Sequence, residues 1–174
     1  MKTILSDRQL ALTCKRLAHQ VLENHPGLEN TVIIGLQPRG IFFSNQLVSV
    51  LQELTGKSVQ YGQLDITFYR DDIRKSLHIA NTTHIPFDIE NKRVILVDDV
   101  LYTGRTIRAA LDALLDFGRS AEVQLCVLVD RRFSRELPIQ PDYTGKVIDT
   151  IVSQRVKVSW KENEGIDEVV LLDN

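Results

Sequence analysis

The chain has 174 residues, of which 43% are hydrophobic and 25% are charged, a composition typical of one folded domain and not of a disordered protein. Its formal net charge of -2 excludes a protein that coats nucleic acid with its whole surface, although a local basic face is compatible with it. No charged start with an apolar signal segment and no apolar run of membrane-spanning length is present, which predicts a cytoplasmic protein without membrane contact.

The first predicted element is a helix. Residues 6–9 have the form of a capping box, and apolar residues then recur at helical spacing, so we expect this helix to end near His25. Its polar side carries Lys15 and Arg16. This side is either an ordinary solvated face or a contact surface for nucleic acid.

A strand-loop-helix unit follows. The apolar run Thr31–Leu36 predicts a strand buried on both faces, as in a parallel sheet, and we expect a helix over residues 41–55 that Gly56 closes. The loop between them carries Arg39 and Gly40. By itself this loop favours a structural turn over an anion-binding loop, and only the acidic motif further along the chain makes the second interpretation credible.

The next segment changes from apolar to polar. Residues 59–69 read as extended chain, and the stretch over about 70–84 is cationic with little periodicity. Two interpretations remain open for this stretch: a surface loop, or a lid that closes over a site from which water must be excluded.

Residues 94–106 carry the most specific chemistry. An aliphatic run predicts a buried parallel strand that ends in Asp98 and Asp99, and a loop with Thr103 and Gly104 then opens a helix. Ligands of open α/β sheets bind at the carboxyl ends of the strands, and amides at a helix start bind phosphate. Because carboxylates accept hydrogen bonds from sugar hydroxyls, the implied ligand is a ribose 5-phosphate. The structural alternative is a strand whose acidic end only caps the next helix.

The last third of the chain predicts more strands. We expect a parallel strand over 122–129, a basic loop over 131–138 that turns into another strand, and a hairpin formed by residues 156–160 and 169–171. The predicted fold is therefore α/β, with a central, mainly parallel sheet flanked by helices, in a single domain over residues 1–174. Cys14 and Cys126 are far apart in apolar surroundings, which favours buried free thiols over a disulfide or a metal site.

The thirteen residues 94–106 resemble the motif with which type I phosphoribosyltransferases bind 5-phosphoribosyl 1-diphosphate (PRPP). Segments 64–72, 127–131, 135–139 and 142–146 narrow the resemblance to the bifunctional pyrimidine operon attenuators and uracil phosphoribosyltransferases, over nearly the whole chain. The resemblance implies the type I phosphoribosyltransferase fold, with a lid over about 70–84, a small hood made by about 131–150 with the first helix region, and a terminal β-hairpin.

The resemblance also implies the reaction, which is transfer of ribose 5-phosphate from PRPP to uracil, giving UMP and diphosphate. Mg²⁺ would travel with PRPP and lie near Asp98 and Asp99, without a site built by the protein alone. Arg70 joins these two aspartates as an implied catalytic residue. Lys146 and Val147 are the implied uracil contacts, although Lys146 reads equally well as a surface lysine. The implied contacts with PRPP and UMP are Arg39, Gly40, Asp98, Asp99, Val100, Leu101, Tyr102, Thr103, Gly104, Arg105, Thr106 and Arg131.

A second activity is implied by the same family, which binds messenger RNA leader hairpins in response to UMP or UTP through basic faces of a dimer. Lys15, Arg16 and Arg135 fall at RNA-facing places, and a homodimer or higher homo-oligomer is implied. This chain departs from the family pattern, because residues 131–138 are one residue longer and lack its histidine, and Gln140 replaces an arginine. Fewer cationic contacts to phosphate predict weaker RNA binding.

Two alternative functions stay open. One is a nucleotide-sensing RNA-binding regulator with little catalysis, and the other is a phosphoribosyltransferase for another base, such as hypoxanthine. Against the second, Tyr102 stands where the purine enzymes of the superfamily carry an aspartate.

Overall fold

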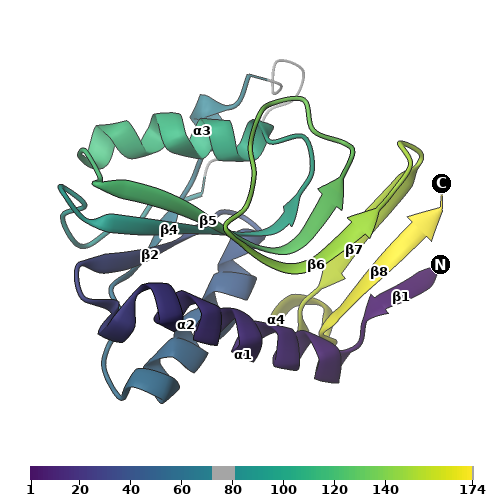
Figure 1. Cartoon of the computed structure of the whole chain (residues 1–174). Coiled ribbons are helices and arrows are strands. Elements are labelled where there is room, and N and C mark those ends of the chain that lie inside the picture. Colours follow the sequence, from purple (N-terminus) through teal and green to yellow (C-terminus); the bar gives the residue numbers. More distant parts are fainter. Residues whose placement is uncertain (72–80, 174) are drawn as a thin grey trace.

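The computed structural model describes residues 1–71 and 81–173, which form an α/β structure with two sheets (Figure 1). The main sheet has five strands in the order β3-β2-β4-β5-β6, and every neighbouring pair is parallel, as the apolar runs predict. Its strands are β2 (Thr31–Leu36), β3 (Tyr61–Leu64), β4 (Arg93–Leu101), β5 (Glu122–Arg132) and β6 (Tyr143–Asp149).

Helices cover both faces of this sheet. Helices α1 (Asp7–Asn24) and α2 (Gly40–Thr55) lie on one face, and α3 (Arg105–Leu114) lies on the other (Figure 1). Successive side chains of β4 alternate between two apolar clusters, so Ile95 packs with α1 and α2 while Leu96 packs with α3. The remaining short helices are η1 (Pro26–Leu28), η2 (Thr67–Tyr69), η3 (Leu115–Phe117) and α4 (Lys161–Glu164).

Local sequence signals fix the helix ends. The predicted capping box is confirmed, since Ser6 N donates to Gln9 Oε1 at 2.9 Å while Ser6 Oγ accepts from Gln9 N at 3.5 Å. Gly56 ends α2 with a φ of +65°, the left-handed conformation expected of a C-terminal glycine.

The second sheet joins the two ends of the described chain. Strands β7 (Gln154–Ser159) and β8 (Glu168–Asp173) form the predicted antiparallel hairpin. The sequence did not predict β1 (Lys2–Leu5), which pairs with the other edge of β8. The first and last strands therefore lie side by side (Figure 1).

Several expected boundaries differ from the structure. Strand β4 continues through the acidic pair to Leu101, because Asp98, Val100 and Leu101 still pair with β5. Strand β5 continues past Val129 to Arg132, because its last three residues still pair with β6. The segment expected in the hood contains β6, one of the two edge strands of the main sheet. Residues 72–80 of the expected lid lie outside the described residues, and His84 forms an antiparallel bridge with Gln63 of β3.

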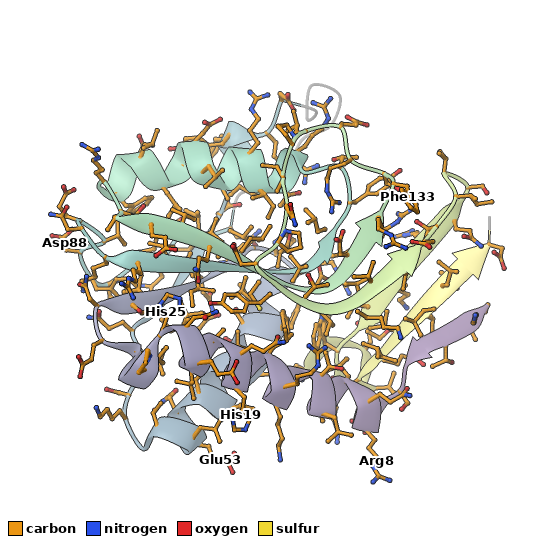
Figure 2. The ribbon with its side chains drawn as sticks, in the orientation of Figure 1. Arg8, His19, His25, Glu53, Asp88 and Phe133 are labelled. Carbon is orange, nitrogen blue, oxygen red and sulfur yellow. The ribbon has the colours of Figure 1, made fainter. Side chains whose placement is uncertain are left out.

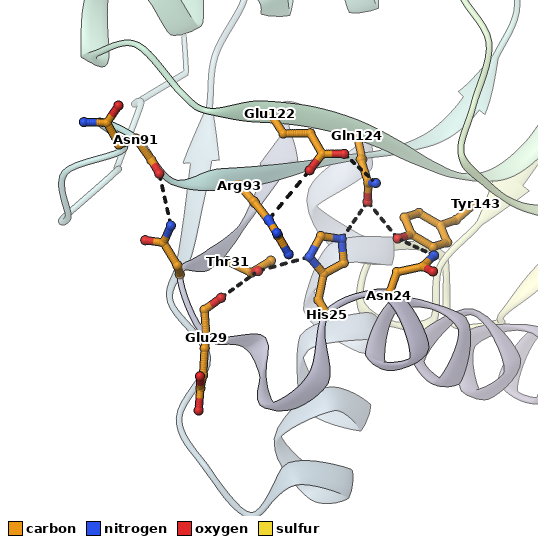
Figure 3. Close-up of polar contacts among 10 residues, drawn as sticks. Asn24, His25, Glu29, Thr31, Asn91, Arg93, Glu122, Gln124 and Tyr143 are labelled. Carbon is orange, nitrogen blue, oxygen red and sulfur yellow. Dashed lines mark hydrogen bonds and ion pairs between the residues drawn. The ribbon is translucent and has the colours of Figure 1, made fainter.

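A polar network lies at the end of the main sheet where β2 and β5 begin (Figure 3). Gln124 Oε1 lies 2.7 Å from His25 Nε2 and accepts a hydrogen bond of 2.7 Å from the Tyr143 hydroxyl. Since an amide oxygen only accepts, His25 Nε2 carries a proton and Nδ1 faces the Thr31 hydroxyl at 3.2 Å. His25 lies between α1 and the sheet, whereas His19 projects from α1 (Figure 2). His25 is thus a satisfied core histidine.

Two further classes of feature are absent from residues 1–71 and 81–173. No helix among them is long and apolar enough to cross a membrane. In the same part of the chain, no group of three or more histidine, cysteine, aspartate or glutamate side chains gathers into a metal cage. Both predicted free thiols, Cys14 and Cys126, are buried and unpaired in the described structure.

Candidate active site

A cavity of about 390 Å³ opens at the carboxyl edge of the main sheet, between the end of β4 and the start of α3. It brings together Arg70 and most of the motif at residues 98–106. The lining residues are Arg70, Asp98, Val100, Leu101, Tyr102, Thr103, Gly104, Arg105, Thr106, Ile107 and Glu136.

Residues 102–106, here called the anion loop, form one wall of the cavity. Gly104 directly precedes α3 with a φ of +94°, a conformation that L side chains rarely adopt. The first amides of a helix have no partner within it, and the helix dipole makes this end positive. An anion with several oxygens, such as a phosphate, fits this wall.

The two adjacent aspartates face different partners. Asp98 lines the cavity, whereas Oδ2 of Asp99 lies 3.5 Å from Nε of Arg39. Each carboxylate accepts the amide of the next residue, at 2.9 Å for Asp98 and 2.8 Å for Asp99. Burial, and then the neighbouring charge of Asp99, raise the pKa of Asp98 well above its usual value. Burial also raises the pKa of Asp99, and Arg39 opposes this shift.

Arg39 and Gly40 occupy the loop between β2 and α2. The Arg39 guanidinium contacts Asp99, lies 3.6 Å from Oε1 of Glu164, and donates to the carbonyl of Val158. Gly40 allows α2 to approach β4, because a Cβ there would lie 2.8 Å from the carbonyl oxygen of Val97. Neither residue lines the 390 Å³ cavity, and both lie beside the acidic pair. Their role in diphosphate binding stays a prediction.

Cations and carboxylates alternate along the cavity rim. Nη1 of Arg70 donates to the Thr106 hydroxyl at 3.5 Å. Arg105 forms ion pairs with Asp71, at 2.9 Å, and with Glu136, at 2.6 Å. These hydrogen bonds, Glu136 first, raise the pKa of Arg105. The rim thus keeps the guanidinium groups of Arg70 and Arg105 near the anion loop.

Arg131 lies behind Tyr102, outside the cavity. Its guanidinium carbon is 4.0 Å from the centroid of the Tyr102 ring, a cation–π contact. It also donates to the Thr150 hydroxyl at 3.0 Å and to the Gln154 carbonyl at 2.9 Å. Arg131 is buried, which lowers its pKa. Arg131 is therefore fixed by its hydrogen bonds and packs against the ring of Tyr102.

The predicted uracil contacts lie apart from this cavity. Lys146 lines a separate cavity of about 310 Å³ between β6 and the second sheet, together with Lys2 and Leu171. Val147 is the next residue of β6, and its side chain is 44% exposed. Their assignment to the base stays a prediction.

The three predicted RNA contacts are not alike. Lys15 is exposed on α1, beside α2. Arg16 donates to the carbonyls of Gly145, at 2.5 Å, and Thr144, at 3.4 Å, and so ties α1 to β6. Arg135 lies behind the anion loop, where it donates to the carbonyl of Tyr102 at 2.6 Å. Only Lys15 of these three side chains makes no hydrogen bond or ion pair within the part of the chain that the structure describes.

Sequence reasoning missed Ile107 and Glu136 as lining residues. Glu136 reaches the cavity because its amide donates to the carbonyl of Thr103 at 2.9 Å, which brings residues 135–137 against the anion loop. In the sequence, this segment stands out only as part of a basic loop and by its resemblance to the family. A local pattern cannot place it, since its partner lies in a distant part of the sequence.

Comparison with known proteins agrees with this fold. The family model described as a phosphoribosyl transferase domain matches residues 1–163. The bifunctional protein PyrR of Deinococcus radiodurans is 51% identical over 173 residues, which cover 98% of this chain and 94% of that protein. The bifunctional protein PyrR of Bacillus mycoides is 45% identical over 174 residues, 98% of this chain and 96% of that protein.

Solved structures with the same fold are more distant in sequence. A hypoxanthine phosphoribosyltransferase of Trypanosoma cruzi superposes with a TM-score of 0.76 at 17% identity, covering 99% of this chain and 97% of that one. One of Staphylococcus aureus gives a TM-score of 0.74 at 19% identity, covering 99% and 91%. These likenesses confirm the predicted type I phosphoribosyltransferase fold. From the matched domain and the near full-length likeness together, the chain belongs to the phosphoribosyltransferase family and, within it, to the bifunctional PyrR proteins.

Proposed function

We propose that this protein is a cytoplasmic uracil phosphoribosyltransferase, which makes UMP and diphosphate from uracil and PRPP. One observation carries the proposal: the carboxylate of Asp98 and the anion loop line the same cavity of about 390 Å³. A ligand held there needs both a phosphate and hydrogen-bond donors, and a phosphorylated ribose has both.

The protein would bind the two ends of the ribose 5-phosphate differently. Amides and hydroxyls of the anion loop receive the phosphate at the start of α3, where the helix dipole favours negative charge. The carboxylate of Asp98 accepts hydrogen bonds from the ribose hydroxyls. Arg39, whose guanidinium faces Asp99, would bind the diphosphate of PRPP.

The residues present fit Mg²⁺ that arrives with PRPP. Mg²⁺ prefers oxygen ligands and is usually held by one or two carboxylates together with substrate phosphates. Asp98 and Asp99 supply two such carboxylates, and no larger acidic cage exists among residues 1–71 and 81–173. When bound, Mg²⁺ neutralises charge on the leaving diphosphate.

The reaction breaks one bond and forms another at C1 of the ribose. The C1–O bond to diphosphate breaks, N1 of uracil bonds to C1, and the N1 proton is released. Arg39 and Arg70 would stabilise the negative charge that grows on the departing diphosphate. Tyr102, which Arg131 holds from behind, would border the base, and Lys146 with Val147 would contact its edge.

The second part of the proposal concerns regulation. Proteins named bifunctional PyrR resemble this chain over almost all of its length. We infer that, as a homo-oligomer, it also binds a messenger RNA leader hairpin when UMP or UTP fills the site, and so attenuates pyrimidine genes. Lys15 is exposed and available for such a contact.

The test is UMP formation from PRPP, Mg²⁺ and a panel of bases. Uracil turnover that exceeds hypoxanthine turnover supports the proposal, whereas turnover of hypoxanthine alone contradicts it. A filter assay with a pyrimidine leader RNA, with and without UMP, tests the second part. Nucleotide-dependent RNA retention without turnover would favour a regulator with little catalysis.

A further inference from the structure

The segment of residues 135–137 bonds two consecutive carbonyls of the anion loop. Nη1 of Arg135 donates to the carbonyl oxygen of Tyr102 at 2.6 Å. The amides of Glu136 and Leu137 both donate to the carbonyl oxygen of Thr103, at 2.9 and 3.2 Å. These contacts come from a segment about thirty residues away in the sequence, so they are tertiary contacts and not part of a local turn.

Because peptide groups are planar, these contacts to the carbonyls also orient two backbone amides of the anion loop. In a planar trans peptide the C=O and the next residue's N–H point in opposite directions. A fixed Tyr102 carbonyl therefore fixes the Thr103 amide, and a fixed Thr103 carbonyl fixes the Gly104 amide. Both residues line the cavity, and neither amide has an acceptor within residues 1–71 and 81–173. The two amides remain free to bind an anion.

The Arg135 side chain is itself held in place. Nε donates to the Ile139 carbonyl at 2.9 Å, and Nη2 forms an ion pair with Asp130, the residue that pairs with Leu101 across β4 and β5. Its side chain is only 22% exposed. All three nitrogens of this guanidinium thus bond to protein, and a planar fork with fixed partners is rigid.

We propose that Arg135 is a positioning residue, which presents the Thr103 and Gly104 amides to the 5-phosphate of the ligand. This inference rests on the proposed function for the identity of that ligand. It assigns Arg135 to the nucleotide site instead of to a direct contact with RNA. Prearranged amides need no reorganisation when the anion arrives, so their loss weakens phosphate binding first.

The test measures binding of ribose 5-phosphate by calorimetry, without uracil or turnover. We expect Arg135→Ala to weaken this binding roughly tenfold or more, the size of one hydrogen bond to a charged group. In the transfer assay, the KM for PRPP should rise by a similar factor while the KM for uracil stays unchanged. Added N-ethylguanidinium should restore part of the ribose 5-phosphate affinity, because it refills the site between Asp130 and the Tyr102 carbonyl.

Arg132→Ala is the matched control. Arg132 precedes Arg135 by three residues and forms a bidentate ion pair with Asp149, at 2.9 and 3.0 Å. It does not line the cavity. It should leave both KM values unchanged. If Arg135→Ala does not fold, as judged by circular dichroism, Asp130→Asn keeps Arg135 but removes the charge that orients it, and should raise the KM for PRPP alone.

Three results would each overturn the inference. The first is ribose 5-phosphate affinity within twofold of wild type in both Arg135→Ala and Asp130→Asn, and the second is an equal loss in Arg132→Ala. The third is an Arg135 variant that loses only RNA retention. The proposed function fails separately. If the wild type binds ribose 5-phosphate in an Arg135-dependent way but makes no UMP, the transferase proposal is wrong and the positioning role stands.

Discussion

The Nε atom of Arg39 lies 3.5 Å from Oδ2 of Asp99, which ties the loop after β2 to the acidic pair of β4. Glu164 of α4 lies against the same guanidinium, at 3.6 Å. Three segments that are distant in the sequence therefore meet at one cation. Asp99 is buried, so its negative charge depends on this cation more than an exposed carboxylate would.

Removal of Arg39 should expose this dependence. Without the cation, the pKa of Asp99 rises further above its usual value, so the stability lost in Arg39→Gln should grow as pH rises from 5 to 8. We expect a loss on the order of 1–2 kcal/mol at the higher pH, because Arg39 is partly exposed. Urea unfolding at both pH values measures it. An equal loss at the two pH values would contradict the coupling to Asp99.

Asp98→Asn should separate stability from activity. Burial raises the pKa of Asp98, so the folded protein keeps this proton to a higher pH than the unfolded chain, and its stability falls as pH rises from about 4 through the raised pKa. The asparagine side chain of the variant does not ionise, so it avoids this loss of stability. We expect the variant to be more stable than wild type at pH 8, on the order of 1 kcal/mol, and similar near pH 4, while transfer falls about a hundredfold or more. Unchanged kinetics would remove Asp98 from the site.

Gly104→Ala should raise the KM for PRPP about tenfold or more and destabilise the fold by roughly 1–2 kcal/mol. The strain follows from its φ of +94°, and the new Cβ would lie 3.0 Å from Cγ1 of Ile139. Gly56→Ala is the matched control, since Gly56 has a φ of +65° and nothing within 4 Å of an added Cβ. Gly56→Ala should lower the melting temperature through the same backbone strain and leave the kinetics of transfer unchanged. Normal PRPP affinity in Gly104→Ala would contradict the anion loop assignment.

Arg16 and Lys15 should differ in what they affect. Arg16→Ala removes the hydrogen bonds to Gly145 and Thr144 and should cost about 1 kcal/mol of unfolding free energy. Lys15→Ala should stay within about 0.5 kcal/mol of wild type. If Lys15 contacts RNA phosphate, its loss should also lower the slope of log affinity against log salt by about one. Chemical denaturation and filter binding measure the two effects.

Chelation of Mg²⁺ should stop transfer without unfolding the protein. If Mg²⁺ arrives with PRPP, as proposed, its binding adds nothing to the folding energy of the free protein, unlike in a structural zinc site. EDTA should abolish UMP formation and leave the melting temperature unchanged. A fall in melting temperature would indicate a metal held by the protein itself.

Local chemistry explains what the sequence predicts well. The capping box at Ser6, the buried strand β2 and the glycine that ends α2 are each set by a few neighbouring residues, and their boundaries agree with the structure. The cavity is only partly local: Asp98 and residues 100–106 come from one segment, whereas Arg70 and Glu136 reach the cavity from distant parts of the chain. The carbonyls of the anion loop are also held by the distant residues 135–137.

Contacts between side chains that are distant in the sequence could not be predicted from local patterns. Arg131 and Arg135 both look like surface cations in a basic loop, yet one stacks on Tyr102 and the other holds its carbonyl. Strand β1 was missed because four residues carry too short a pattern, and its pairing with β8 supplies the stabilisation. In each case the deciding contact joins residues that are far apart in the chain.

The pairing of β1 with β8 has a consequence for synthesis on the ribosome. Strand β1 is translated well before β8 and stays without this partner until β8 follows. Until then β8 cannot cover it, while the units around β2 and β4 can already assemble. The small sheet should therefore close late, after the nucleotide-binding half of the molecule has taken shape.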